Sequence, residues 1–195
     1  MGWFGRRKRE KDAIVQKVLG LLSGDHLATV GQMIGADEQA TGSALSSVVP
    51  LLVLALVKNV STPQGAEALH QAVTRDHDGS ILSDVSGYLA NPEAANGAGI
   101  LGNVLGDKQS AVTEGLAQHT GLSSGQIGRL LIIVAPLVMG ELGQQRQQQS
   151  LNVTGLTRFV GDQQHLASDQ QLRAHQVQMT ELAWMFLGNP YSRGQ

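Results

Sequence analysis

The sequence has no cysteine among its 195 residues, which excludes disulfide bonds, thiolate metal ligands and cysteine nucleophiles. A chain without cysteine fits a reducing compartment, and we expect the protein in the cytoplasm. Aromatic residues are also scarce, at 4% of the chain, so leucine, valine, isoleucine and alanine must build the core. Apolar residues make up 42% of the sequence, which is enough for the core of one domain.

Long apolar runs are missing as well. The strongest runs, Val48–Val57 and Leu130–Met139, are far shorter than the ~20 residues that cross a membrane. We therefore expect buried helices there and no transmembrane segment. The apolar residues in 13–22 are interrupted by Gln16 and Lys17, and no small-residue cleavage site follows them. We accordingly expect no signal peptide.

Charge is low and unevenly spread, with a net value of −2. Five cations against Glu10 give the first eleven residues a net charge of +4, which leaves −6 for the remainder. The cations are Arg6, Arg7, Lys8, Arg9 and Lys11. A basic arm on an acidic body is not the pattern of a nucleic-acid-binding core.

Trp3 and Phe4 precede this run of cations. An aromatic pair beside cations suits contact with a membrane surface, and a solvated start of the chain explains the same composition. We expect residues 1–11 to form a disordered basic arm. It is the part of the chain best suited to an electrostatic contact with an acidic partner.

Helix start and stop signals recur along the sequence, whereas the alternating pattern of a strand is absent. Glycine stands where helices should end, as Gly35 does. The expected starts are Asp12, Asp25, Asp37, Thr62 and Asn91, the last two followed by proline, and the capping boxes Ser123/Gln126 and Ser168/Gln171. These signals predict an all-α protein.

The sequence also repeats itself at an offset of 86 residues. When 27–56 is placed over 113–142, eight of thirty positions are identical. The identical pairs are Gln32/Gln118, Gly35/Gly121, Gly42/Gly128, Leu45/Leu131, Val48/Val134, Pro50/Pro136, Leu51/Leu137 and Leu56/Leu142. Each unit predicts a helix, a glycine turn and a second helix that is apolar on all sides around a central proline. Such helices must be buried, so we expect the two to pack on each other, each kinked at its proline.

A shorter echo links 79–87 with 98–106, which share isoleucine, leucine, valine and glycine at the same spacing. We expect two short helices there, each ended by a glycine.

Three segments carry a family resemblance. They are Gly99-Ile100-Leu101-Gly102-Asn103-Val104-Leu105-Gly106-Asp107-Lys108-Gln109, Thr120-Gly121-Leu122-Ser123, and Leu130-Leu131 with Ala135-Pro136-Leu137-Val138-Met139-Gly140. Together they resemble the YidB-like family of bacterial proteins, over roughly Ala13–Leu151. The resemblance implies an all-α fold with a homeodomain-like arrangement of helices. It implies no activity, catalytic residue or cofactor.

The C-terminal part lies outside the resemblance. Leu172, His175, Met179, Leu182 and Phe186 step by three and four residues, beside Trp184, which is typical of a stripe that packs on one other helix. The stripe either folds back on the protein's own core or docks on a partner or a second copy. The polar segment Gln144–Gln149 would be the link that allows such freedom.

We accordingly divide the chain into the arm 1–11, a duplicated YidB-like helical domain 12–151, a C-terminal helical extension 152–187 and a flexible tail 188–195.

Histidines and acids give no catalytic or metal-binding signature. No two of the six histidines are three or four residues apart, as a zinc pair on one helix face requires. Asp76-His77-Asp78-Gly79 resembles the opening of a calcium loop but lacks the later ligands, so Asp78 should cap the next helix. Glu67 and His70 should form an ordinary surface pair. An enzyme would need a concave pocket with polar groups converging around His70, His77 or His119.

The sequence therefore favours a non-catalytic interaction or assembly protein, without catalytic, cofactor or metal sites. Its expected partner contacts are Trp3, Phe4, Arg6, Arg7, Lys8, Arg9, Lys11, Leu172, Met179, Leu182, Trp184 and Phe186. The alternative is nucleic-acid binding through the basic arm and the helix-turn-helix-like units. It is disfavoured because the helix after Ser123 offers Arg129 and then apolar residues, while Asp37 and Glu38 would repel phosphate.

Overall fold

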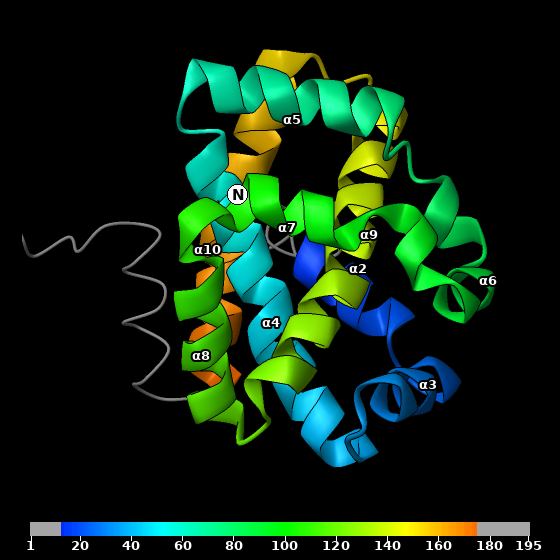
Figure 1. Ribbon diagram of the computed structural model, residues 1–195. Coiled ribbons are helices and arrows are strands. Elements are labelled where there is room, and N and C mark those ends of the chain that lie inside the picture. The colour runs from blue at the N-terminus through cyan, green and yellow to red at the C-terminus, as the bar shows by residue number, and fades with distance from the viewer. Residues whose placement is uncertain (1–12, 175–195) are drawn as a thin grey trace, which may run out of the picture.

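The computed structural model describes the backbone of residues 13–174 and the side chains of residues 13–167. This part of the chain is helical and has no strand (Figure 1). Its α-helices are α2 (Ile14–Leu21), α3 (Asp25–Ile34), α4 (Glu38–Asn59), α5 (Pro63–Arg75), α6 (Val85–Ala90), α7 (Gly97–Leu105), α8 (Gln109–Thr120), α9 (Ser124–Gln148) and α10 (Val153–Ala174). Short 3₁₀-helices lie at η1 (Ser80–Ser83), η2 (Pro92–Ala95) and η3 (Gly106–Lys108). The prediction of an all-α fold is confirmed.

Several predicted caps form as expected. Asp37 accepts a hydrogen bond from the amide of Ala40 at 2.7 Å, and Thr62 accepts one from Gly65 at 3.1 Å. Ser123 and Gln126 form the full capping box, each side chain accepting from the backbone amide of the other. These bonds satisfy amides that the first turn of a helix leaves unpaired.

The two apolar helices, α4 and α9, lie in contact at the centre of the fold, as expected. Pro50 and Pro136 are buried inside them. The helices extend well beyond the apolar runs of the sequence, to 22 and 25 residues, and are long and apolar enough to cross a membrane. Their best windows have mean hydropathies of 2.0 and 1.5, and 72% of each window is buried inside the protein. That burial matches the core helices of soluble proteins.

The turns before α4 and α9 correspond residue by residue at the 86-residue offset. Gly35 and Gly121 both adopt left-handed backbone, with φ of 72° and 77°, and the caps Asp37 and Ser123 follow two residues later. Helix α3 contacts α9 and α8 contacts α4. The Gln126 side chain also donates to the carbonyl of Gly35 at 2.8 Å, which joins the two turns.

Several local predictions are wrong. Ser168 lies inside α10, which begins much earlier, where Asn152 accepts a hydrogen bond from the amide of Gly155 at 2.9 Å. The segment Gln144–Gln149 is no flexible link, because α9 continues to Gln148 and Gln145 is buried.

Another error concerns the short echo. Gly87 lies inside α6, whereas Gly106 does end α7 with a φ of 56°. Asn91 likewise precedes a 3₁₀-helix and makes no side-chain cap.

Helix α10 packs along α4 and also contacts α5 and α2. Leu156, Val160 and Ala167 are buried in this packing. The described part of the C-terminal segment therefore belongs to the same hydrophobic core as the two central helices.

Candidate functional site

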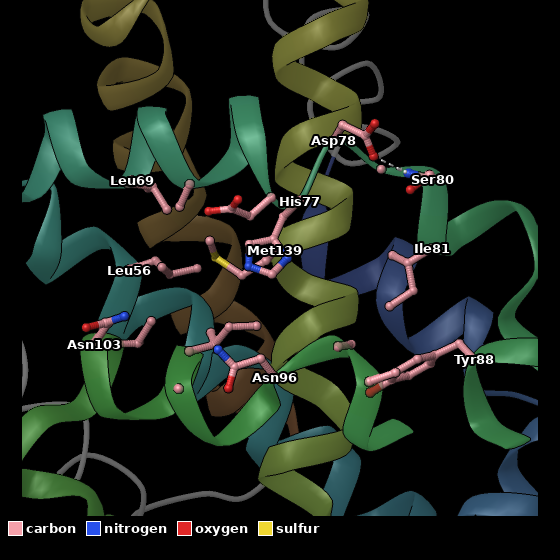
Figure 2. A pocket seen from close by; sticks show the side chains of 18 of the residues that line it. Leu56, Leu69, His77, Asp78, Ser80, Ile81, Tyr88, Asn96, Asn103 and Met139 are labelled. Carbon is pink, nitrogen blue, oxygen red and sulfur yellow. Dashed lines mark hydrogen bonds between the residues drawn. The ribbon is translucent and has the colours of Figure 1, made fainter. Parts of the chain in front are cut away.

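An open cleft of about 940 Å³ lies between α5 and α7. Figure 2 shows α5 above it, α7 below it, and α4 and α9 behind it. The loop 76–79 and the segment 80–88 close one end. The cleft is therefore assembled from parts of the chain that are far apart in the sequence.

The base of the cleft is apolar. Leu69 reaches down from α5, Leu56 projects from α4 and Met139 from α9 (Figure 2). Ile100 of α7 completes this set, and all four side chains are buried in the protein. An apolar base with polar groups around it is the usual make-up of a ligand site.

The loop that carries His77 is positioned by glycines of α9. A Cβ atom at Gly143 would overlap the carbonyl oxygen of His77, and one at Gly140 would overlap the side chain of Ile81. These two glycines are three residues apart and therefore share a face of α9. They let the segment 77–81 lie directly on the helix backbone, and that contact brings His77 into the cleft.

The carboxylates at the rim are held by bonds of their own. Asp76 pairs with the exposed Arg75 at 3.1 Å, and this hydrogen bond lowers the pKa of Asp76. Asp78 accepts from the amide of Ser80 at 2.9 Å, which lowers the pKa of Asp78. Asp84 accepts from the amide of Gly87 at 2.8 Å as the cap of α6. The prediction that Asp78 is the N-cap of the next helix is wrong, because Gly79 holds that position of η1 and Asp78 bonds Ser80 from one residue further back.

His77 lies half-buried among these groups. Burial lowers the pKa of His77, and the nearby carboxylates of Asp76 and Asp78 oppose that effect only in part. The imidazole is therefore neutral at neutral pH. Burial also raises the pKa of Tyr88, whose hydroxyl donates to the carbonyl of Ile133 at 2.7 Å. Tyr88 thus fixes α6 to α9 at the closed end of the cleft.

Amide side chains complete the rim. Asn59 donates to the carbonyls of Ala55 and Val104 and so ties α4 to α7. The side chains of Asn91, Asn96 and Asn103 line the cleft, are exposed, and make no hydrogen bond with any residue that the structure describes. They present free donors and acceptors to whatever enters.

The partner contacts expected from the sequence lie outside the described side chains. This holds for Trp3, Phe4, Arg6, Arg7, Lys8, Arg9, Lys11, Leu172, Met179, Leu182, Trp184 and Phe186. The contacts expected from these residues therefore stay predictions.

The expected surface pair of Glu67 and His70 does not form. Glu67 accepts from the side chain of Gln71 at 3.1 Å, while the His70 ring lies 3.3 Å from the carbonyl of Leu151. Within residues 13–167, no three histidine, aspartate or glutamate side chains gather where they could hold a metal ion.

The helix-turn-helix-like unit before α9 presents its apolar face inward. Ile127, Leu130 and Leu131 are fully buried, whereas Arg129 is exposed. The first turn of α4 exposes Asp37 and Glu38. In the described chain the apolar faces of these units are used for core packing. The charge that they leave exposed is mainly acidic.

The sequence did not reveal the cleft. Its clearest trace was the pair Gly140 and Gly143 in an otherwise apolar helix, which indicates a close approach of backbone. The asparagines of the rim stand in turn-like contexts that offered no reason to group them.

The profile of a family of bacterial proteins of unknown function, DUF937, matches residues 16–145. The chain belongs to this family. The match confirms the resemblance to YidB-like proteins and runs from α2 to α9, so it contains the whole lining of the cleft. No curated protein and no solved structure matches the chain.

Proposed function

We propose that this DUF937 protein is a non-catalytic interaction protein, which binds a cationic peptide segment with apolar side chains in the cleft between α5 and α7. The observation that carries the proposal is the chemistry of the cleft. Its base is apolar, and its described lining includes three carboxylates, at Asp76, Asp78 and Asp84, but no lysine or arginine.

The apolar base supplies affinity. Leu56, Leu69 and Met139 offer a surface on which one or two aliphatic side chains of a peptide can be buried. Each such side chain contributes about 1.5–3 kcal/mol when it leaves water completely. This gain must exceed the cost of ordering the peptide, so charge at the rim decides which peptides bind.

The rim favours cations over anions. Asp76 already accepts two bonds from Arg75, while Asp78 and Asp84 each accept one backbone bond, from the amides of Ser80 and Gly87. A carboxylate has about four acceptor positions, so each can accept further bonds from a lysine or arginine of the ligand. Because the rim is exposed, this attraction should weaken as salt is added.

The amides of Asn91, Asn96 and Asn103 suit a peptide backbone in particular. Each carries a donor and an acceptor, as every peptide group does. Their freedom from other hydrogen bonds in the described chain supports a peptide over a simple organic cation.

The non-catalytic part of the proposal rests on how His77 is surrounded. Its neighbours Asp76 and Asp78 are bound to Arg75 and Ser80, so neither orients the imidazole as a catalytic base requires. One observation favours catalysis as a second candidate: a neutral, half-buried histidine lies in a cleft with polar groups, which is the arrangement required above for an enzyme. Replacement of His77 by glutamine distinguishes the two, since it would abolish turnover but only modify peptide affinity.

The experiment uses two labelled peptides, acetyl-Lys-Leu-Lys-Leu-Lys-amide and its counterpart with glutamate in place of lysine. Fluorescence anisotropy should show saturable binding of the lysine peptide alone, weakened between about 0.05 and 0.5 M salt. The double variant Asp78→Asn, Asp84→Asn keeps side chains that can cap helices and removes two charges. It should bind about tenfold more weakly, or about 1.4 kcal/mol.

Asp107→Asn is the matched control, because Asp107 is exposed and is not one of the residues that line the cleft. It should leave the affinity unchanged. Equal binding of both peptides, or an equal loss in the Asp107 variant, would contradict the proposal.

A further inference from the structure

A second, smaller hollow lies where α9 ends and α10 begins. Its volume is about 330 Å³. His70 of α5, Arg146 and Gln147 of α9, and residues 150–152 of the turn line it. No carboxylate is among the described residues of this lining, in contrast to the larger cleft.

Arg146 is the charged residue of this hollow whose side chain lacks a partner in the described chain. Its side chain is half-buried, and its Nε atom is fully buried without a hydrogen-bond partner. The guanidinium makes no ion pair with any residue in the described chain. A buried donor without a partner costs about 1–3 kcal/mol, and more when it is charged. Lys17 and Arg75, by comparison, each have a carboxylate at about 3 Å.

The surrounding polar groups are well placed for an anion. His70 is held by its contact with the carbonyl of Leu151 at 3.3 Å. The amide of Leu151 donates back to the carbonyl of Arg146 at 2.9 Å, which fixes the turn. Ser150 has a φ of 50°, an uncommon conformation for a residue with a side chain. Ser150 and Gln147 both line the hollow, and the Ser150 hydroxyl and the Gln147 side-chain amide make no bond to another described residue, so they can donate to a ligand.

We propose that this hollow binds an oxyanion, a phosphate or carboxylate group, with Arg146 as its main ligand. A planar guanidinium pairs with such groups through two parallel hydrogen bonds, and these charge-assisted bonds are about twice as strong as neutral ones. Ser150 and Gln147 supply further donors. The hollow is much larger than the ~30 Å³ that one water occupies, so it has room for the group and part of the molecule that carries it.

The test is a titration of the full-length protein, followed by the amide NMR shifts of residues 146–152. Inorganic phosphate, glycerol phosphate and acetate are added separately. Saturable shifts with a dissociation constant on the order of 1 mM are expected for at least one of them. A response to phosphate but not to its ester indicates a free ion, the converse indicates a phosphate carried on a larger molecule, and acetate alone indicates a carboxylate.

Arg146→Gln removes the charge and should weaken binding at least about tenfold. Arg146→Lys keeps a positive charge but lacks the planar guanidinium, so its affinity should lie between those of the wild type and Arg146→Gln. Arg158→Gln is the matched control, because Arg158 is an exposed arginine of α10 outside the hollow. It should bind like the wild type.

The proposal is overturned if the wild type shows no saturable shift, because the hollow then holds water alone. It is also overturned if Arg158→Gln loses as much affinity as Arg146→Gln, because the effect is then general charge screening. Should Arg146→Gln fail to fold, Ser150→Ala replaces it, with an expected loss of about threefold. Peptide binding in the larger cleft can succeed or fail independently of these results.

Discussion

The ammonium of Lys17 lies 2.9 Å from Oε1 of Glu141, whose side chain is only 4% exposed. The same oxygen accepts from the side chain of Gln145 at 2.8 Å. The bond joins α2 to the inner surface of α9, and Ile14 of α2 is fixed to α10 by a 3.0 Å bond from its amide to Gln163. A buried carboxylate is stable only when it is paired, so this ion pair helps to fix the docking of α2, together with its buried residues Ile14, Val15 and Val18.

Replacement of Lys17 by methionine should therefore destabilise the protein by about 2–3 kcal/mol, because Glu141 keeps its charge and loses its cation. The double variant Lys17→Met, Glu141→Gln should recover most of that loss, since no buried charge remains. Urea unfolding measures both. Arg75→Met serves as control: its pair with Asp76 is exposed, and no change in the midpoint is expected. A double variant no more stable than the single one would contradict this view.

The lowered pKa of His77 predicts a dependence of stability on pH. Burial holds the folded-state pKa of His77 below the ordinary value of 6.5, so the unfolded chain takes up a proton first as the pH falls. The stability is fully present above pH 6.5 and is lost as the pH falls through the folded-state pKa. The Hε1 resonance of His77 should titrate with a midpoint below 6.5.

His77→Gln should remove this part of the pH dependence, measured as the difference in unfolding midpoint between about pH 7.5 and 5.5. His165→Gln is the matched control, because His165 is exposed on α10. If both variants change the pH profile equally, the effect does not come from the burial of His77.

Gly143 and Gly128 offer a comparison within one helix. A methyl group at Gly143 would overlap the carbonyl of His77, while one at Gly128 would meet open space. Gly143→Ala should cost about 1–3 kcal/mol because the loop at 77–79 must move. Gly128→Ala should stabilise by about 0.5–1 kcal/mol, the usual gain of alanine over glycine within a helix.

Thermal unfolding measures both glycine variants. The peptide affinity of the cleft should fall only for Gly143→Ala, since that variant alone displaces His77. Equal effects of the two substitutions on stability would show that the loop does not depend on the close contact with α9.

Local signals predicted the elements of the fold well, because a cap and its helix are close in sequence. Asp37 and Ser123 mark helix starts through bonds that reach only three residues ahead. Ser168 carries the same type of signal, yet it lies inside α10, where the buried residues Leu156 and Val160 hold the helix against the core. Tertiary packing overrides a local preference of this size.

Local signals could not predict the cleft, because its residues are far apart in the sequence. Leu56, His77 and Met139 meet in the cleft from three separate elements, and no short-range pattern relates them. In the sequence, Arg146 is one more polar residue of a glutamine-rich segment. Its buried Nε atom without a hydrogen-bond partner is recognised only in the folded structure, where the turn at 150–152 lies beside it.

The C-terminal stripe supplies the remaining prediction, which concerns assembly. Truncation at Asn152 would expose the core beneath Leu156, Val160 and Ala167, so paired substitutions are the sharper tool. Leu182→Glu with Phe186→Glu alters two apolar positions of the stripe and leaves the described part of α10 intact. If the stripe joins two copies of the chain, light scattering should show a dimer for the wild type and a monomer for this variant. If the wild type is a monomer at every concentration and the variant is strongly destabilised, the stripe instead folds back on its own core, and partner contacts must be sought at the acidic cleft and the basic arm.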